Sequence, residues 1–286
     1  IANTFYAKQM YRYIMSGGYD TIFCPHLFPC EALSYIRKHF KTDFKCYGVQ
    51  TDYTCIPFWG EPEMDAFFAP HKDLVDECVE KGIKREKVVV TGIPVSMRFY
   101  DKPTKKAARE TLSLPQDKEI YLVMTGSMGF GNMTDLVKNI IIEGNENTYV
   151  VALVGSNEEL KKELLTAIPR EKLLCVDFTN DVPVYMSACD VLLTKPGGLS
   201  STEAAACNVP FIHTAPIPGC ETKNALFFAN MGASICKETP EDSAKAAVSL
   251  MKDKTAQQKM LIAQRENINP FAARDIVDYA IANANL

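Results

Sequence analysis

The sequence predicts an α/β protein built from two doubly wound domains, and three observations lead to that expectation. Apolar runs typical of short buried strands alternate with helix-like periodic segments along the chain. A length of 286 residues exceeds one ordinary compact domain and suits two. A hydrophobic content of 47% is enough to form real cores.

The expected elements form two series. In the first, we expect buried strands at residues 21–24, 45–49, 66–69 and 87–91, with helices at 31–39 and 72–81. In the second, we expect strands at 119–124, 149–154, 173–176, 191–194, 210–213 and 233–236, with helices at 132–143, 157–166, 182–188, 201–207, 223–230, 240–252 and 255–266. Residues 101–106, a charged stretch with a proline, are expected to connect the domains. The first series is short of strands and the chain begins at Ile1 rather than at a Met, so we expect a truncated first domain.

Composition argues against several classes of protein. The net charge is −4, and a nucleic-acid-binding protein would need a basic face for the phosphates. The ten cysteines include no CxxC pair, which disfavours a zinc ribbon, and their apolar surroundings fit a reducing cytoplasm. No run of about 18 apolar residues exists, so no bilayer-spanning segment is expected.

The strongest local signal is KPGGLSSTEA, which follows an expected strand. Its paired glycines, Gly197 and Gly198, let the backbone approach a ligand closely. The first amides of the next helix suit a diphosphate, with Ser200 or Ser201 as N-cap. Glu203, one turn further on, is placed to accept hydrogen bonds from a ribose diol. The alternative is a merely capped helix in which Glu203 favours the first turn.

Two more loops follow strands of the same domain. GSMGFGN, at 126–132, resembles phosphate-cradling turns but matches neither the dinucleotide fingerprint nor the P-loop, and an ordinary turn is the alternative. APIPGCETKNA, at 215–225, holds an ordered loop, and its Glu221 and Asn224 begin a helix, where capping is their alternative role. Because ligands bind at the carboxyl ends of parallel strands, we treat the three segments as one site.

The first domain carries two further motifs after strands, CPHLFP and QTDYTCIPFW. His26 is a candidate general base or acceptor-binding residue, with a structural role as the alternative. Asp52 is a candidate catalytic residue. The alternative is a structural role, in which it caps or orients its neighbours. The aromatics Tyr53, Phe58 and Trp59 are expected in core or interdomain packing, with acceptor contact as the alternative.

The ordered series CPHLFP, QTDYTCIPFW, TGIPV, TGSMGFGN, KPGGLSSTEAAA and PIPGCETKNA resembles the monogalactosyldiacylglycerol synthase and processive diacylglycerol glucosyltransferase family. A more distant likeness is to the peptidoglycan GlcNAc transferase. The resemblance covers nearly the whole chain. It implies the fold called GT-B, two Rossmann-like domains facing across a cleft. Residues 1–96 are then the remainder of an N-terminal acceptor-side domain, 97–268 the donor-binding domain, and 269–286 a helix returning to the first domain.

The resemblance implies inverting, metal-independent transfer of a hexose from a UDP-sugar to a membrane lipid such as diacylglycerol. The UDP-sugar is a substrate, and no cofactor, metal or nucleic acid is implied. A cytoplasmic protein, peripheral on the inner face of the plasma membrane, is expected. The residues implied in donor binding are Gly126, Ser127, Met128, Gly129, Gly197, Gly198, Leu199, Ser200, Glu203, Pro218, Gly219, Glu221 and Asn224.

Two departures from the family leave the identity of the catalytic base undecided. The candidates are His26, Asp52 and a residue of a missing segment. The family begins with a strand and a histidine-containing loop that is absent before Ile1, and we expect that segment to supply the base. Relatives often carry a histidine where this chain has Ile56. Two alternatives remain: a non-catalytic UDP-sugar-binding remnant, and an enzyme like the UDP-GlcNAc epimerases.

Overall fold

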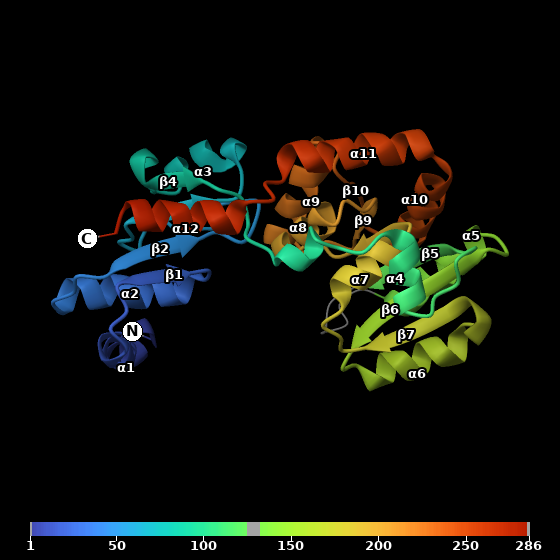
Figure 1. The fold of residues 1–286 in the computed structure, drawn as a ribbon, viewed down its shortest axis with the longest axis horizontal. Coiled ribbons are helices and arrows are strands. Elements are labelled where there is room, and N and C mark those ends of the chain that lie inside the picture. The colour runs from blue at the N-terminus through green and yellow to red at the C-terminus, as the bar shows by residue number, and fades with distance from the viewer. Residues whose placement is uncertain (1, 125–131, 285–286) are drawn as a thin grey trace. The chain divides into compact units, whose positions relative to one another are not determined.

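The computed structural model describes residues 2–124 and 132–284, and the chain divides into two compact units. One unit comprises residues 1–94 and 271–286, and the other comprises residues 95–270. Each unit contains one parallel sheet with helices packed on it (Figure 1), which confirms the expected α/β class. Among the described residues, no helix is both long and apolar enough to cross a membrane.

The first unit has a four-stranded sheet in the order β1-β2-β3-β4. Its strands are β1 (Thr21–Cys24), β2 (Lys45–Val49), β3 (Ala66–Ala69) and β4 (Val88–Val90), and its helices are α1 (Ala2–Gly17), α2 (Leu27–His39), η1 (Lys72–Leu74), α3 (Val75–Glu80), η2 (Arg85–Lys87) and α12 (Ala272–Ala282). Helix α12 comes from the far end of the sequence. Its Ile276 and Ala280 are buried against Tyr47 and Phe68 of the sheet, and its Tyr279 meets both rings edge-on.

The second unit has a six-stranded sheet in the order β10-β9-β8-β5-β6-β7. Its strands are β5 (Glu119–Met124), β6 (Thr148–Gly155), β7 (Leu173–Asp177), β8 (Val191–Thr194), β9 (Phe211–Thr214) and β10 (Ile235–Lys237). Its helices are η3 (Met97–Phe99), α4 (Lys105–Thr111), α5 (Met133–Glu143), α6 (Glu158–Ala167), η4 (Arg170–Lys172), α7 (Val182–Ala188), α8 (Gly198–Ala206), α9 (Cys220–Asn230), α10 (Pro240–Lys252) and α11 (Lys254–Asn267).

This strand order creates a topological switch point. The chain starts in the middle of the sheet at β5, runs outward to β7, and returns to place β8 on the other side of β5. Strands β6 and β9, which follow β5 and β8 in the chain, therefore lie on opposite sides of the β5–β8 pair. Doubly wound sheets open their ligand-binding crevice at this point, so the topology marks it as the place to look for a site.

All ten expected strands are present in the described residues, within two residues at each end. Helices are less well predicted. Three begin three or four residues earlier than expected, at Leu27, Gly198 and Cys220, and α1 and α4 were not expected. Strands buried on both faces, such as β8, show as unbroken apolar runs, whereas a helix start depends on cap geometry that several neighbouring residues can satisfy.

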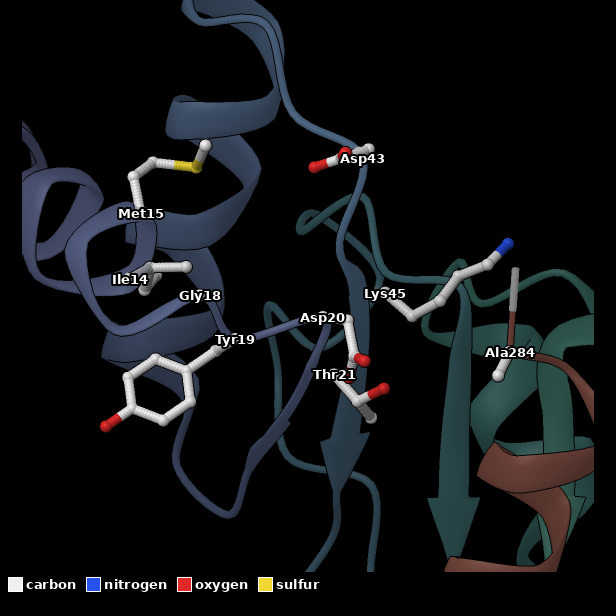
Figure 2. Close-up of a pocket in the computed structure, with 9 residues that line it drawn as sticks. All are labelled: Ile14, Met15, Gly18, Tyr19, Asp20, Thr21, Asp43, Lys45 and Ala284. Atoms are coloured by element: carbon white, nitrogen blue, oxygen red, sulfur yellow. The ribbon is translucent and has the colours of Figure 1, made fainter. Parts of the chain in front are cut away.

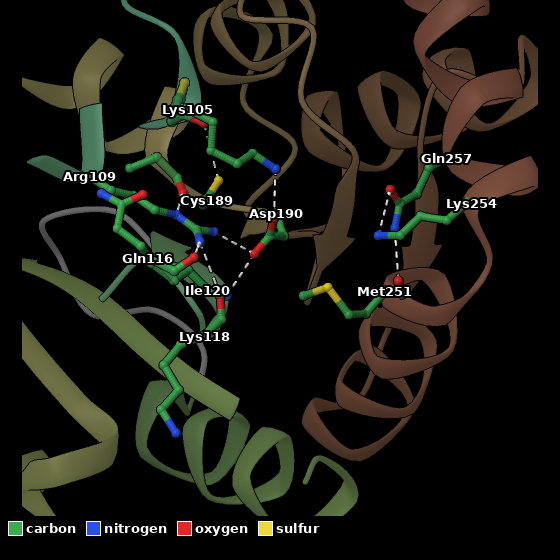
Figure 3. Close-up of polar contacts among 12 residues, drawn as sticks. Lys105, Arg109, Gln116, Lys118, Ile120, Cys189, Asp190, Met251, Lys254 and Gln257 are labelled. Carbon is green, nitrogen blue, oxygen red and sulfur yellow. Dashed lines mark hydrogen bonds and ion pairs between the residues drawn. The ribbon is translucent and has the colours of Figure 1, made fainter. Parts of the chain in front are cut away.

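The expected connection at residues 101–106 is wrong. The boundary between the units falls earlier, after Pro94, and residue 105 already begins helix α4. The reason is a buried ion-pair network that ties α4 to the sheet (Figure 3). Asp190 lies between Lys105 and Arg109, at 2.6 and 2.7 Å, and also accepts the backbone N–H of Ile120 at 2.8 Å.

Arg109 is the central donor of this network. Its side chain is 6% exposed, and besides Asp190 it donates to the backbone carbonyls of Ala188, Gln116 and Lys118. Burial alone would raise the pKa of Asp190, but Lys105, the Ile120 amide and Arg109 outweigh it and hold the pKa below its usual value. The carboxylate therefore stays charged and joins α4, β5 and the start of β8.

We predict that Arg109→Met lowers the free energy of unfolding of the second unit by about 3–5 kcal/mol, because the Asp190 carboxylate loses its buried partner and three backbone carbonyls lose the donor that Arg109 supplies. Lys105 is half exposed, so Lys105→Met should cost under about 1 kcal/mol. Urea denaturation of both variants measures this difference. Equal losses would contradict the central role of Arg109.

Candidate functional site

The glycine turn between β8 and α8 lies at the switch point. Helix α8 begins at Gly198 with Gly197 as its N-cap, so the expected caps Ser200 and Ser201 are wrong. The reason is that the second glycine enters the helix, which places both serines inside its first turn. No side chain caps this end, and within the described part of the chain the amides of Gly198, Leu199 and Ser200 have no acceptor.

Gly197 leaves this helix end open. Its φ is −70°, which any residue can adopt, so the backbone does not require glycine there. A Cβ at Gly197 would meet no described atom within 4 Å. The missing side chain therefore gives a ligand access to the amides and the positive end of the helix dipole.

A buried histidine fixes α8 against the sheet. His213 of β9 is fully buried, and its Nε2 and Nδ1 lie 2.8 and 3.2 Å from the hydroxyls of Ser201 and Ser234. Burial lowers the pKa of His213 to about 3, so the ring stays neutral, with one donor and one acceptor nitrogen. Because serine hydroxyls can donate or accept, both nitrogens are satisfied.

The loop after β9 supports the glycine turn. Asn224, on α9, is fully buried and its Nδ2 donates to the Pro196 carbonyl at 3.0 Å, so it supports the glycine turn. Glu221 accepts the Ile217 amide at 2.9 Å and orders its own loop. Gly219 is the N-cap of α9 with a φ of +116°, a conformation that requires glycine.

Glu203 has the most unusual environment in this unit. Its carboxyl is largely buried, and burial raises its pKa to about 7. None of the described residues donates a hydrogen bond to it or forms an ion pair with it. A largely buried carboxylate without described donors costs free energy, and a ligand with paired hydroxyls would offset that cost by donating hydrogen bonds to it.

The predicted donor contacts Gly126, Ser127, Met128 and Gly129 lie outside the described residues. At the carboxyl edge of the second sheet lies an apolar hollow of about 180 Å³ that was not predicted from the sequence. Met124, Leu153 and Asp177, at the ends of β5, β6 and β7, line it together with Phe178. Phe178 is 78% exposed. The position of Phe178, directly after an expected strand, was the feature of the sequence that could have indicated this hollow.

In the first unit, His26 and Asp52 come together. Both line a cavity of about 260 Å³ at the carboxyl ends of β1 and β2, with Thr51 and Thr54 as further polar groups. The Nδ1 of His26 accepts the Phe28 amide at 3.3 Å. A neutral His26 therefore carries its proton on Nε2 and presents a donor to the cavity.

Of the three aromatic residues in this region, two are buried and one is exposed. Tyr53 and Trp59 are 2% and 4% exposed, and the ring of Trp59 meets Phe67 edge-on, as packing residues do. Phe58 is 61% exposed, so of its two expected packing roles the place in the core of the first unit is wrong. The positive φ of Phe58, +78°, turns its side chain out of the packed segment.

A separate cavity of about 320 Å³ lies at the opposite edge of this sheet, where β1 and β2 begin (Figure 2). Thr21 and Lys45 open the two strands there, beside Tyr19 and the carboxylates of Asp20 and Asp43. Parallel sheets bind substrates at the other edge, so this cavity stands apart from the candidate site.

Comparison with known proteins shows which families the chain matches. Residues 1–95 match the family model "Monogalactosyldiacylglycerol (MGDG) synthase", and residues 107–267 match "Glycosyl transferases group 1". The processive diacylglycerol beta-glucosyltransferase of Staphylococcus aureus strain JH9 is 28% identical over 256 residues, which are 88% of this chain and 66% of that protein. The chain thus spans just under two thirds of the curated relatives that it matches.

Solved structures share the fold at low identity. Acinetobacter baumannii MurG superimposes with a TM-score of 0.66 at 16% identity, over 96% of this chain and 76% of that one. UDP-GlcNAc 2-epimerase from Neisseria meningitidis, bound to UDP-GlcNAc, gives 0.71 at 15% identity, over 98% and 81%. These likenesses show the fold alone. Since the second family match covers more than half of the sequence, the chain belongs to glycosyl transferases group 1.

Proposed function

We propose that this chain carries out inverting, metal-independent transfer of a hexose from a UDP-sugar to a diacylglycerol-type membrane lipid. The observation that carries the proposal is Glu203, a largely buried carboxylate without a described donor, one turn from uncapped helix amides. This pair of groups suits a ribose diol and a diphosphate. The matches to the MGDG synthase model and to diacylglycerol glucosyltransferases support the lipid acceptor.

The donor would lie along the carboxyl edge of the second sheet. We place the diphosphate on the amides of Gly198, Leu199 and Ser200, and the ribose hydroxyls on Glu203. The uracil fits the apolar hollow, where the exposed Phe178 ring offers a stacking surface. The hexose then falls near the loop of Pro218 and Gly219, both exposed. In this assignment Glu221 and Asn224 position the loop and the glycine turn.

The proposed reaction is a single in-line displacement. An acceptor hydroxyl oxygen bonds to the anomeric carbon while the bond from that carbon to the UDP oxygen breaks, and the configuration inverts. UDP leaves with the negative charge, which the helix amides stabilise without a metal. Of the two described candidates, Asp52 is the better base, because the cap contact leaves His26 as a donor that orients the acceptor.

A second candidate function is epimerisation of a UDP-sugar. The likeness in fold to the Neisseria meningitidis 2-epimerase favours it. The third is binding of a UDP-sugar without catalysis.

Incubation of the chain with labelled UDP-glucose and UDP-galactose separates these functions. With diacylglycerol vesicles, a transferase releases UDP and labels the lipid. Label in free isomerised sugar without any acceptor would instead identify an epimerase. If UDP binds but neither product forms, the chain is a binding protein and the proposed transfer is wrong.

We predict that UDP binds more tightly as the pH rises through about 7. The buried carboxyl of Glu203 is protonated below that pH, because its pKa is raised to about 7, and ribose hydroxyls bind its ionised form. Calorimetric titration from pH 6 to 8 measures this rise. Glu203→Gln removes it and leaves only the pH dependence that UDP itself contributes.

The same substitution has a stability signature. Because the folded pKa of Glu203 lies above the unfolded value, the contribution of this group to stability is largest below about pH 4.5 and falls as the pH rises toward 7. Glu203→Gln removes this contribution, so the free energy of unfolding of the variant should gain on that of the parent between these pH values. Identical pH profiles of UDP affinity in parent and variant would show that Glu203 is not the ribose contact.

A further inference from the structure

The loop that follows β7 is held at both of its ends by a cation from elsewhere in the second unit. Lys161 of α6 reaches both carboxylate oxygens of Asp177 at 2.7 Å, where the loop begins. Arg98 of η3 donates to the carboxylate of Asp181 and to the backbone carbonyl of the residue before it, both at 2.9 Å, where the loop ends. We call residues 177–181 the clamped loop.

Asp181 does not use its side chain to cap the helix that it precedes. It is the N-cap of α7, a position where an aspartate ordinarily accepts an amide of the first helical turn. Its carboxylate makes no such bond and accepts from Arg98 instead. The amide of Asp181 donates to the hydroxyl of Thr179 at 3.0 Å. These contacts hold the loop rather than the helix.

The neighbouring strand is irregular at the same place. The pairing of β6 with β7 shifts register between Leu153 and Gly155, and Gly155 pairs with Asp177. Gly155 has a φ of +60°, in the left-handed region. Such irregularities bend a strand, re-aim the residues around them and are common beside binding sites. All three of these residues line the apolar hollow, and so does Phe178 of the clamped loop.

Arg98 also connects the clamped loop to the helix that begins with the uncapped amides. Its own element, η3, packs against α8 within the second unit. Phe99 of η3 is 7% exposed, and the Ser96 hydroxyl accepts the Arg98 amide at 3.3 Å, so the backbone of the arginine is fixed. The guanidinium therefore joins an element packed on α8 to the loop beside the hollow.

Resting on the proposed function, we propose that Arg98 and Lys161 are positioning residues for the donor nucleotide. They hold the clamped loop so that the ring of Phe178 meets the base while the diphosphate lies on α8. Neither residue is among those that line the hollow, so both act through the loop. A loop that is already ordered loses less conformational freedom when the nucleotide binds, and the affinity for the base is higher.

Calorimetric titration with UDP and with inorganic diphosphate tests this inference, because the second ligand has no base. The side chains of Arg98 and Lys161 are 55% and 27% exposed, so each ion pair contributes modestly. We expect Arg98→Met and Lys161→Met each to weaken UDP binding about threefold, and the double variant about tenfold, with the affinity for diphosphate unchanged. Arg98→Lys keeps the charge but loses the forked contact, so its affinity for UDP should lie between those of the parent and Arg98→Met.

Two matched controls remove cations of the same unit that have no ion pair within the described part of the chain. Lys162 lies next to Lys161 on α6, and Arg170 lies in η4, just before β7. Lys162→Met and Arg170→Met should both bind UDP like the parent. Parental affinity for UDP in the double variant would overturn the inference. An equal loss of diphosphate binding would also overturn it, because it would indicate a general loss of structure.

A kinetic measurement separates failure of this inference from failure of the proposed function. In the transfer assay, the double variant should raise the KM for the UDP-sugar and leave kcat unchanged, since the base is bound equally in the ground state and the transition state. A fall in kcat at unchanged KM would contradict the positioning role while leaving the transfer itself established. A parent chain that binds neither UDP nor diphosphate would instead count against the proposed function.

Discussion

The candidate donor site depends on one buried imidazole. His213 stands in the core of the second unit, bonded through both ring nitrogens to Ser201 of α8 and to Ser234 before β10. It fixes the first turn of α8 relative to the sheet, while Asn224 holds the preceding turn through the Pro196 carbonyl. Burial lowers the pKa of His213 to about 3, so its contribution to stability is present above about pH 6.5 and falls away as the pH drops toward 3.

Buried side chains support the glycine turn. The surface that the turn offers to a ligand can therefore consist of backbone amides and one carboxylate. Amides at a helix end and a glycine without a Cβ present a rigid anion site with no side chain to reorganise. Glu203 on the same helix is energetically unfavourable in its ionised form, because burial raises its pKa to about 7. A ligand that supplies hydroxyls to Glu203 and a diphosphate to the amides would satisfy both, which is the physical basis of the proposed donor.

The sequence was informative where local pattern decides the structure. Strands β8 and β9 of the second sheet are buried on both faces, so a run such as Val191–Thr194 is recognisable in the sequence. The glycine turn at Gly197 and Gly198 was predicted because its motif follows an apolar run. The contacts that support this turn were not predicted, because Asn224 and Pro196, or Ser201 and His213, meet only in the folded chain. The helical start at Lys105 was missed because its anchor, Asp190, lies 85 residues away. The exposure of Phe58 depends on a backbone angle that its neighbours impose.

The most direct test of the account is a crystal structure of this chain with UDP bound. We predict that the ribose hydroxyls lie within hydrogen-bonding distance of the Glu203 carboxylate, the diphosphate lies on the amides of Gly198 to Ser200, and the uracil rests against Phe178. A nucleotide whose ribose points away from Glu203, or one that occupies the cavity beside Tyr19 at the other edge of the first sheet, would contradict the account.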